Sequence, residues 1–283
     1  MNLNNSDFKY FEENGFLTLK KFFNEADLEQ FESCVVSLYA MQAKKIGEYK
    51  DRLEKVLNIK TTNFERICAI YEMMENDDKE ALYQVQKFFP ASPILNGIFN
   101  DQFRKTIKEF FVGDESSILI SGPCLFINRP NTERLLYKWH SEAHYYPKRR
   151  RFINIWFPLF DAKNKSNGTM SFKVKSHKKD FPFADYQGFN KDTQNKSNFF
   201  IQFEIPQNFV DEYDEHLLNT ERGDLVIFNR SLVHRSNNNV SPNYSFNGIA
   251  RVWDPTDDLT LSGDLEALPY GKNIGRPNLI VEA

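Results

Sequence analysis

The second half of the chain is built from short runs of β-forming residues, and this pattern limits the fold more than any other feature of the sequence. From about residue 116 the chain alternates between apolar, β-branched or aromatic runs and turn-like clusters such as NKSNG and SNNNVSPN. Short strands separated by turn signals are typical of an all-β sandwich or barrel. The runs are SSILIS, CLFIN, YKWHSEAHYY, FINIWFPLF, TMSFKV, FFIQFEI, GDLVIF and FNGIARVW.

The first part of the chain has helical periodicity instead. Ser6 and Gly15 are placed to cap and to end a short amphipathic helix, and FLTL then reads as a strand. Asn24 with Asp27 marks the start of a longer helix. A further helix is expected between residues 92 and 113, because a Ser-Pro pair opens this stretch and a glycine closes it.

We therefore expect one domain over residues 1–283, of the α+β class with a mainly β core. Its parts are a mainly helical region at 1–115, a β-barrel core at 116–256 and a C-terminal extension at 257–283. The chain is 41% hydrophobic and 15% aromatic, so it can bury a sizeable core. The polar, turn-rich stretch at 178–198 is expected to be a long loop near whatever the barrel holds.

Charge and cysteine content exclude several functional classes. The formal net charge of -3 provides no general basic field for nucleic acid or an anionic membrane. No apolar run approaches the roughly 18 residues that span a bilayer, and the N-terminus lacks the pattern of a secretory leader. Cys34, Cys68 and Cys124 are widely spaced and form no CxxC pair, which argues against a disulfide framework or a cysteine zinc site. We expect a cytoplasmic protein.

Two segments carry histidines at spacings that suit metal binding. KWHSEAHYYP places His140, Glu142 and His144 at alternate positions, and in a strand these side chains would project to one side. His234 follows an apolar strand in RGDLVIFNRSLVHRSNNN. A histidine and a carboxylate two residues apart, completed by a distant histidine, match the facial triad that holds Fe(II) and leaves other coordination positions open. The candidate ligands are therefore His140, Glu142 and His234.

Four segments in order resemble the phytanoyl-CoA dioxygenase family, within the wider class of iron and 2-oxoglutarate dependent oxygenases. The resemblance covers most of the chain. It implies a double-stranded β-helix barrel of the jelly-roll or cupin-like kind, with helices packed outside and iron in the mouth. The segments are YFEENGFLTLKKFFNEADLEQF, WHSEAHYYP, INIWFPLFDAKNKSNGTMSFKVKSHK and GDLVIFNRSLVHRSNNNVS.

The resemblance also implies roles for single residues. His140 and His234 correspond to the family's two histidine ligands, and Glu142 stands where the family has an aspartate. Because glutamate is one methylene longer, its carboxylate approaches a metal with a different reach and angle. Trp156 occupies a strand position that commonly lines the cosubstrate pocket. His177 corresponds to the histidine of an S-H-K turn, which we interpret as structural.

The arginine that the family uses for its cosubstrate is absent from the expected position. In the family an arginine eleven residues after the distal histidine binds the far carboxylate of 2-oxoglutarate through its guanidinium fork. Here that position is Ser245, which can hydrogen-bond a carboxylate but cannot neutralise it. Arg251 lies six residues further along the same expected strand, roughly 20 Å away at about 3.3 Å per residue. It corresponds to a second arginine frequent in the family, and a structural role suits it better than direct replacement.

Residues beside the metal motif are candidates for substrate contacts, namely His144, Tyr146, Arg149 and Arg150. The basic run at 148–151 would suit an acidic, phosphorylated or carrier-linked substrate, and a solvated basic loop is the alternative. His144 could become a third histidine ligand only if its strand bends or bulges, so a pocket-lining position is preferred.

Three functions remain open from the sequence. The preferred one is a hydroxylase that uses Fe(II), 2-oxoglutarate and molecular oxygen on a small-molecule substrate. The second is a 2-oxoglutarate-independent metal oxygenase on the same barrel, in which the substrate chelates the metal. The third is a non-catalytic binding protein. Ser245 is the residue that keeps the second and third alternatives open.

Overall fold

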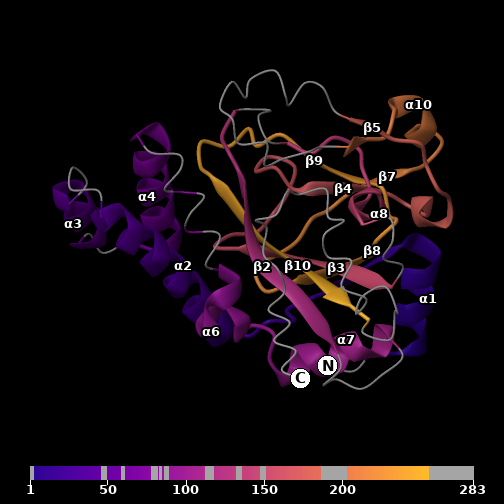
Figure 1. The fold of residues 1–283 in the computed structure, drawn as a ribbon, viewed down its shortest axis with the longest axis horizontal. Coiled ribbons are helices and arrows are strands. Elements are labelled where there is room, and N and C mark those ends of the chain that lie inside the picture. The colour runs from indigo at the N-terminus through magenta and orange to yellow at the C-terminus, as the bar shows by residue number, and fades with distance from the viewer. Residues whose placement is uncertain are drawn as a thin grey trace, which may run out of the picture.

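Ten strands arranged in three antiparallel sheets form the centre of the described structure, with helices beside them (Figure 1). The computed structural model describes residues 3–45, 50–58, 61–77, 82, 85, 89–111, 118–131, 136–146, 151–185 and 203–254. The strands are β1 (Phe16–Leu19), β2 (Leu119–Asn128), β3 (Phe152–Leu159), β4 (Met170–Lys173), β5 (Ala184–Asp185), β6 (Phe203–Glu204), β7 (Glu215–Leu217), β8 (Leu225–Asn229), β9 (His234–Ser236) and β10 (Ser245–Trp253).

The larger sheet has five strands in the order β1-β8-β3-β10-β2. β3 lies at its centre, and all eight of its residues are buried, as expected for a strand covered on both faces. Successive side chains of a strand point to opposite faces, so Ile155 and Phe157 pack with the helices while Trp156 faces the other way. The sheet therefore has an outer face toward the helices and an inner face toward the second sheet.

The second sheet, in the order β7-β4-β9, packs against this inner face. Phe172 of β4 makes the main contact, with its ring centroid 5.0 Å from that of Phe16 and 5.2 Å from that of Phe228. These rings form a small apolar cluster with Trp156 and Val226. Figure 1 shows β4, β7 and β9 above β2, β3 and β10. The remaining strands, β5 and β6, form a separate pair.

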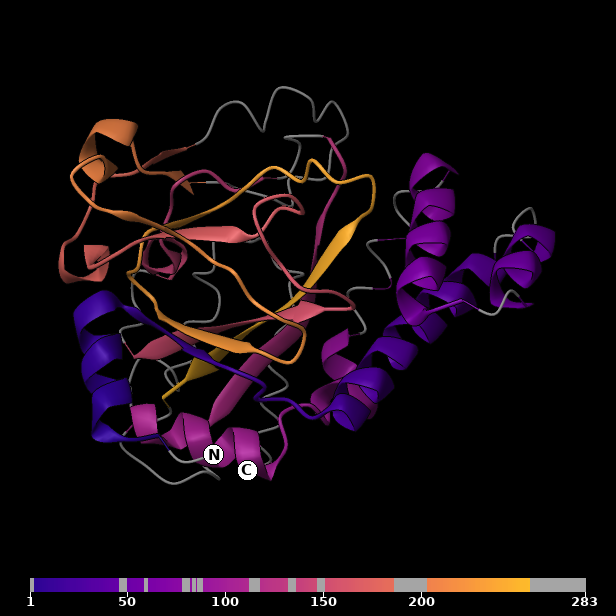
Figure 2. The same ribbon diagram turned by 180° about the vertical axis from the view of Figure 1, so that it is seen from behind.

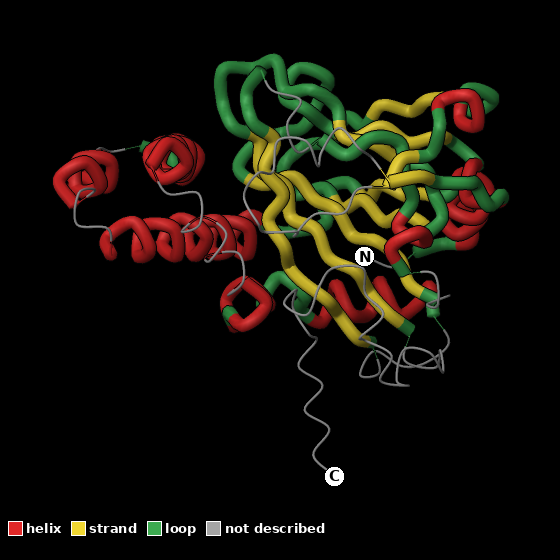
Figure 3. The backbone as a smooth tube through the Cα atoms, turned by 45° about the horizontal axis from the view of Figure 1, so that its top comes forward, coloured by secondary structure: helices red, strands yellow, loops and turns green. Residues whose placement is uncertain are grey.

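Helices α2 (Glu25–Lys45) and α4 (Asn63–Asp77) pack against the outer face of the larger sheet, and α3 (Lys50–Asn58) packs on these two helices. Phe31 of α2 lies 5.9 Å from Phe157 of β3, and Tyr71 of α4 lies 6.0 Å from Phe246 of β10, both between ring centroids. Figures 2 and 3 show α2, α3 and α4 standing together on one side of the strands. The α-helices are α1 (Asn5–Asn14), α2 (Glu25–Lys45), α3 (Lys50–Asn58), α4 (Asn63–Asp77), α6 (Pro93–Asn96), α7 (Asp101–Ile107), α8 (Glu142–Tyr145) and α10 (Gln207–Val210). The 3-10 helices among the described residues are η2 (Phe89–Ala91), η3 (Lys108–Phe110) and η4 (Ser176–Lys178).

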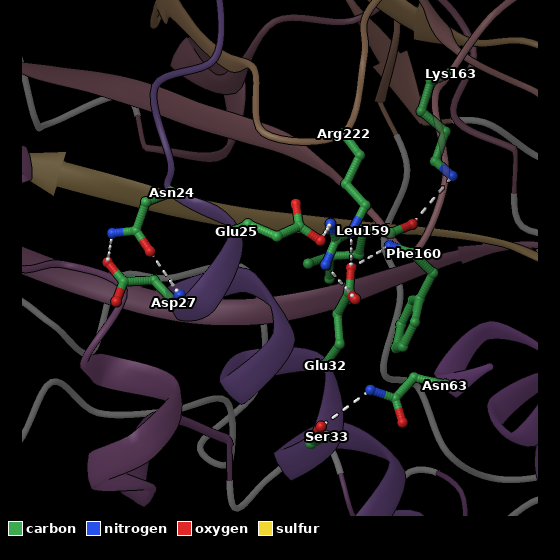
Figure 4. A network of polar contacts seen from close by, with 10 residues as sticks. All are labelled: Asn24, Glu25, Asp27, Glu32, Ser33, Asn63, Leu159, Phe160, Lys163 and Arg222. Atoms are coloured by element: carbon green, nitrogen blue, oxygen red, sulfur yellow. Dashed lines mark hydrogen bonds and ion pairs between the residues drawn. The ribbon is translucent and has the colours of Figure 1, made fainter.

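A buried ion pair fastens α2 to the β core (Figure 4). Glu32 of α2 accepts hydrogen bonds from Nε and Nη2 of Arg222, both at 2.9 Å, and from the backbone N–H of Phe160 at 2.5 Å. Arg222 also pairs with Glu25 in the first turn of α2. The carboxylate of Glu32 is therefore satisfied at a buried position, where an unpaired charge would be costly.

Most of the expected elements are confirmed, with changes at their ends. Gly15 ends α1 in the left-handed conformation at φ 88°, and FLTL is β1. The cap of α1 is Asn4, not Ser6 as predicted, because the Asn4 side chain accepts from the backbone N–H groups of Ser6 and Asp7. Asn24 opens α2 by accepting from the Asp27 N–H at 2.8 Å.

The single helix predicted between residues 92 and 113 is wrong. Ser92 caps a helix of only four residues, α6, and Asn100 caps a new one, α7. Gly113 and the proposed extension at 257–283 lie outside the described residues, as does most of the predicted loop at 178–198. No helix within the described part of the chain is long and apolar enough to cross a membrane.

Candidate metal centre

His140 and His234 are brought together by direct backbone pairing. His234 opens β9, whose neighbour in the sheet is β4, and its other side bonds to the segment that carries His140. The two residues exchange hydrogen bonds, from His140 N–H to the His234 carbonyl at 3.0 Å and back at 2.9 Å. Their ring centroids are 4.1 Å apart, and each residue is 4% exposed. The pairing therefore places two buried imidazoles side by side.

Each ring has one nitrogen occupied and one available. Nδ1 of His140 lies 2.7 Å from the Lys138 carbonyl, and Nδ1 of His234 lies 2.9 Å from the Leu232 carbonyl. Because a carbonyl can only accept, both Nδ1 atoms carry a proton, and Nε2 of the neutral ring keeps its lone pair. Burial lowers the pKa of His140 to about 3 and that of His234 to about 4. Both rings are thus neutral near pH 7, which is the form that binds metals.

Glu142 completes the group. Its Oε1 lies 3.9 Å from Nε2 of His140 and 4.0 Å from Nε2 of His234, and the residue is 8% exposed. One ligand atom from each of the three residues lies within 4.8 Å of the others. Nitrogen and oxygen donors of this kind suit a divalent transition metal such as Fe(II). The structure thus brings together the three residues that the sequence nominated, in an arrangement whose donor set fits the metal.

The local backbone differs from the prediction. The segment around His140 is not a strand that continues to His144, because α8 begins at Glu142. The N–H of Ala143 donates to the Arg230 carbonyl at 3.0 Å, which turns the chain away from the extended direction. The prediction that positions 140, 142 and 144 share one strand face is therefore wrong. Glu142 reaches the histidines from the start of a helical turn.

Arg251 contacts the triad through Glu142, and the sequence reasoning missed this position. It donates to Oε2 of Glu142 from Nε at 2.9 Å and from Nη2 at 2.6 Å. Arg251 is near the C-terminal end of β10, opposite Asn154 of β3. Asn154 is near the start of β3, the strand that follows the segment of His140 and Glu142 in the sequence. Antiparallel pairing of β10 with β3, had it been predicted, would have placed Arg251 near the start of β3. The sequence reasoning compared Arg251 only with Ser245 along the strand and did not relate it to Glu142.

Ser245 lies at the other end of β10, on the same inner face. It is 1% exposed, and its Oγ has no hydrogen-bond partner among the described residues. Two further polar atoms on this face share that condition, Nδ2 of Asn154 and Oδ1 of Asn247. Trp156 is opposite Ile249 in the register, between Ser245 and Arg251. The inner face of β3 and β10 therefore holds buried polar atoms that a bound ligand or water could satisfy.

The other nominated residues lie apart from the triad. The ring of His144 stacks on Phe183 at 4.2 Å, and burial lowers its pKa to about 4. It is not among the three residues whose ligand atoms converge. Tyr146 packs against Phe152 and Trp253, and its ring centroid lies 5.2 Å from the guanidinium of Arg251.

The remaining nominations have different outcomes. Arg149 and Arg150 lie outside the described residues, as does most of the basic run 148–151. The Nε2 atom of His177 lies 3.1 Å from the Glu12 carbonyl and ties η4 to α1. That contact agrees with a structural role for this histidine.

Comparison with known proteins identifies the family. The sequence profile of the family described as phytanoyl-CoA dioxygenase (PhyH) matches residues 11–245. The peroxisomal phytanoyl-CoA dioxygenase of Bos taurus is 23% identical over an alignment of 243 residues, which covers 83% of this chain and 64% of that protein. The chain thus spans less than two thirds of the length of this curated relative.

Solved structures share the fold. The non-heme monooxygenase ThoJ has a TM-score of 0.57 and 17% identity, over 87% of this chain and 76% of that one. EctD from S. alaskensis has a TM-score of 0.57 and 14% identity, over 90% and 78%. EvdO2 from Micromonospora carbonacea, complexed with 2-oxoglutarate, has a TM-score of 0.53 and 13% identity, over 90% and 92%.

Proposed function

This chain belongs to the phytanoyl-CoA dioxygenase family, and from that premise we propose that it is a non-haem Fe(II) oxygenase that uses 2-oxoglutarate and molecular oxygen to oxidise a small molecule. The observation that carries the proposal is the convergence of His140, Glu142 and His234 within 4.8 Å, with both Nε2 atoms unblocked. We also infer that residues 1–283 form one domain and that the two larger sheets close as a double-stranded β-helix, which the TM-scores support.

The residues of the chain would hold and protect the metal in distinct ways. His140 and His234 supply neutral nitrogen ligands whose orientation is fixed by the carbonyls of Lys138 and Leu232. Glu142 supplies one carboxylate oxygen. When bound, iron would activate molecular oxygen, the oxidant, with two of the four electrons for its reduction coming from oxidative decarboxylation of 2-oxoglutarate and two from the hydroxylated substrate.

Aromatic rings around the two histidines would limit access of water. The Tyr137 ring lies 5.0 Å from that of His140, and the Phe228 ring lies 4.9 Å from that of His234. Exclusion of water strengthens electrostatic interactions between the protein and a bound ligand. It also protects the reaction from side reactions with solvent.

We place 2-oxoglutarate along the inner face of β3 and β10, with Trp156 as part of its wall. Two buried polar atoms without partners support this placement. Ser245 Oγ could donate to a carboxylate at one end of β10, and Asn154 Nδ2 could donate to a ligand near the other end, where Asn154 is opposite Arg251. Ser245 offers no positive charge. We therefore expect weaker binding of 2-oxoglutarate than an arginine at this position would give.

Ser245 also favours a second function. Since a buried serine stands where a guanidinium is expected, the chain could be a metal oxygenase that does not use 2-oxoglutarate, or a barrel that only binds its ligand. Arg149, Arg150, His144 and Tyr146 remain predictions as substrate contacts. We propose an acidic or carrier-linked substrate, and the only support for it is the basic run at 148–151.

Turnover of 2-oxoglutarate tests the proposal directly. Purified protein with Fe(II), ascorbate, 2-oxoglutarate and oxygen is expected to form succinate, and His234→Ala is expected to reduce this to the background rate. His216→Ala is the matched control, because this histidine is on the exposed surface of β7 and outside the triad. If the wild-type protein forms no succinate with any of a range of small-molecule substrates, the second function is favoured.

A further inference from the structure

The two oxygens of the Glu142 carboxylate have separate surroundings. Oε1 faces the available Nε2 atoms of His140 and His234, at 3.9 and 4.0 Å. Oε2 accepts both hydrogen bonds from Arg251, at 2.9 and 2.6 Å. A guanidinium fork can bind a carboxylate through both oxygens, but here both donors converge on the one that faces away from the histidines. The carboxylate is thus oriented before any metal is bound.

The position of Arg251 is itself well determined. Its backbone belongs to β10 and pairs with Asn154 on one side and Ser121 on the other. Its guanidinium lies 5.2 Å from the ring centroid of Tyr146, which packs on Phe152. The side chain is only 18% exposed. Few alternative rotamers are open to a side chain confined in this way, so its hydrogen bonds cost little additional entropy.

A glutamate at this position is less restrained than an aspartate unless a neighbouring residue orients its carboxylate. Its side chain has one more rotatable bond than the aspartate of the family, and a free carboxylate could bind a metal through one oxygen or both. Chelation through both oxygens of Glu142 would require Oε2 to give up two charge-assisted hydrogen bonds, which are among the stronger interactions in proteins. Arg251 therefore favours binding through Oε1 alone.

We propose that Arg251 is a positioning residue that fixes Glu142 as a one-oxygen metal ligand and so keeps a further coordination position open for exogenous ligands. This inference rests on the proposed function, because it assumes that the triad binds a metal. Arg251 does not touch the metal in this account; it acts through Glu142. By holding Oε2, Arg251 restrains the additional rotatable bond that Glu142 has compared with aspartate.

Titration of the metal-free protein with Co(II) provides the test, because the intensity of its visible bands reports coordination number. Arg251→Gln is expected to weaken Co(II) binding by about 10- to 100-fold, the usual range for loss of a residue that orients a ligand. We also expect the band intensity to fall, since a released carboxylate can bind through both oxygens and raise the coordination number. Arg251→Lys keeps the charge but not the fork, and should give an intermediate loss.

A matched control and a double-mutant cycle separate this role from a structural one. Arg235 adjoins His234 and pairs with Glu215 at 2.8 Å, so Arg235→Gln removes another arginine–glutamate ion pair, a more exposed one that does not involve the triad. It is expected to keep the wild-type Co(II) affinity and spectrum. In a Glu142→Gln background, Arg251→Gln should have little further effect on Co(II) affinity, because the carboxylate through which it acts is gone. Thermal melting of each variant without metal reports any loss of fold separately.

The outcomes distinguish this inference from the function on which it rests. If the wild-type protein binds no Co(II), the metal site is wrong, and both proposals fail. If the wild type binds Co(II) but Arg251→Gln leaves its affinity and spectrum unchanged, the positioning role alone is contradicted. An equal loss of affinity in the wild-type and Glu142→Gln backgrounds would likewise contradict it. If Arg251→Gln does not fold, the Arg251→Lys spectrum decides, and a wild-type affinity and intensity would overturn the inference.

Discussion

Glu142 can meet both histidines because the chain turns into α8 at this residue. The sequence nominated the correct three residues by assuming a strand, in which alternate side chains share a face. The backbone instead forms a helical turn, in which the N–H groups of His144 and Tyr146 donate to the carbonyls of Ser141 and Glu142, and Ala143 also donates to the Arg230 carbonyl. The types and order of the three residues were therefore informative, whereas the local conformation was not predicted, and one of its hydrogen bonds goes to a residue more than 80 positions away.

Ser245 offers a direct test of where the cosubstrate binds. We expect Ser245→Arg to tighten 2-oxoglutarate binding by about tenfold or more, because a hydrogen bond to a charged group contributes about 1.5–3 kcal/mol. The measurement is calorimetric titration of the Fe(II)-loaded protein under anaerobic conditions. Ser245→Ala, which adds no cation, should not tighten binding. Unchanged affinity in the arginine variant would mean that 2-oxoglutarate binds elsewhere or is not used.

Among the elements, α2 depends on a polar contact as well as on its apolar side. Glu32→Ala is expected to destabilise the protein by about 3–5 kcal/mol, the typical loss when one partner of a buried ion pair is removed. It would leave Arg222 with Glu25 alone and deprive the Phe160 N–H of its acceptor. Chemical denaturation measures the change.

Two variants calibrate that measurement. Glu32→Gln keeps the size of the side chain and an oxygen for the Phe160 N–H, so a smaller loss is expected. Glu13→Ala removes an exposed ion pair with Lys175 and should have no measurable effect. A Glu32→Ala variant as stable as Glu13→Ala would show that apolar packing alone holds α2.

The regular elements were predictable where the signal is local. The helical spacing of Leu28, Phe31 and Val35 places all three in the core, and the β-branched runs became β3, β8 and β10. Prediction failed where one residue competes with another nearby. Asn4 and Ser6 are both good helix caps, and Asn4 is the one whose side chain accepts from N–H groups of the first turn. The short strand β7 has all three residues exposed, so it lacked the apolar pattern that reveals a strand.

For the molecule as a whole, buried neutral histidines link stability to pH. The pKa of His140 is lowered to about 3 and that of His234 to about 4, compared with about 6.5 in the unfolded chain. Below pH 6.5 the unfolded state binds more protons than the folded state, so the stability present above that pH is lost as the pH falls toward 4. Each histidine contributes a slope of up to about 1.4 kcal/mol per pH unit.

We therefore expect the metal-free protein to be less stable at about pH 5.5 than at about pH 7, as measured by urea denaturation in the presence of a chelator. His234→Gln removes one titrating group, so the loss between the two pH values should be smaller in that variant. Equal stability of the wild type at both pH values would show that these imidazoles are not held neutral.

The arrangement of the whole chain was predictable only in outline. Helices before residue 116 and strands after it indicated an α+β protein, and the resemblance to a family supplied the expected barrel. The pairing of β10 with β3, which carries Arg251 to Glu142, could not be obtained from spacing along one strand. A contact between two strand ends depends on sheet order and register, which a single sequence does not specify.

The most direct test of the account is an anaerobic titration of the Fe(II)-loaded protein with 2-oxoglutarate, followed by visible absorption. Chelation of Fe(II) by the keto acid produces a charge-transfer band. We expect this band to develop and saturate in the wild-type protein and to be absent from His140→Ala, which lacks one ligand of the triad. Iron binding without any band would contradict the assignment of 2-oxoglutarate as cosubstrate, and a wild-type band in His140→Ala would contradict the triad itself.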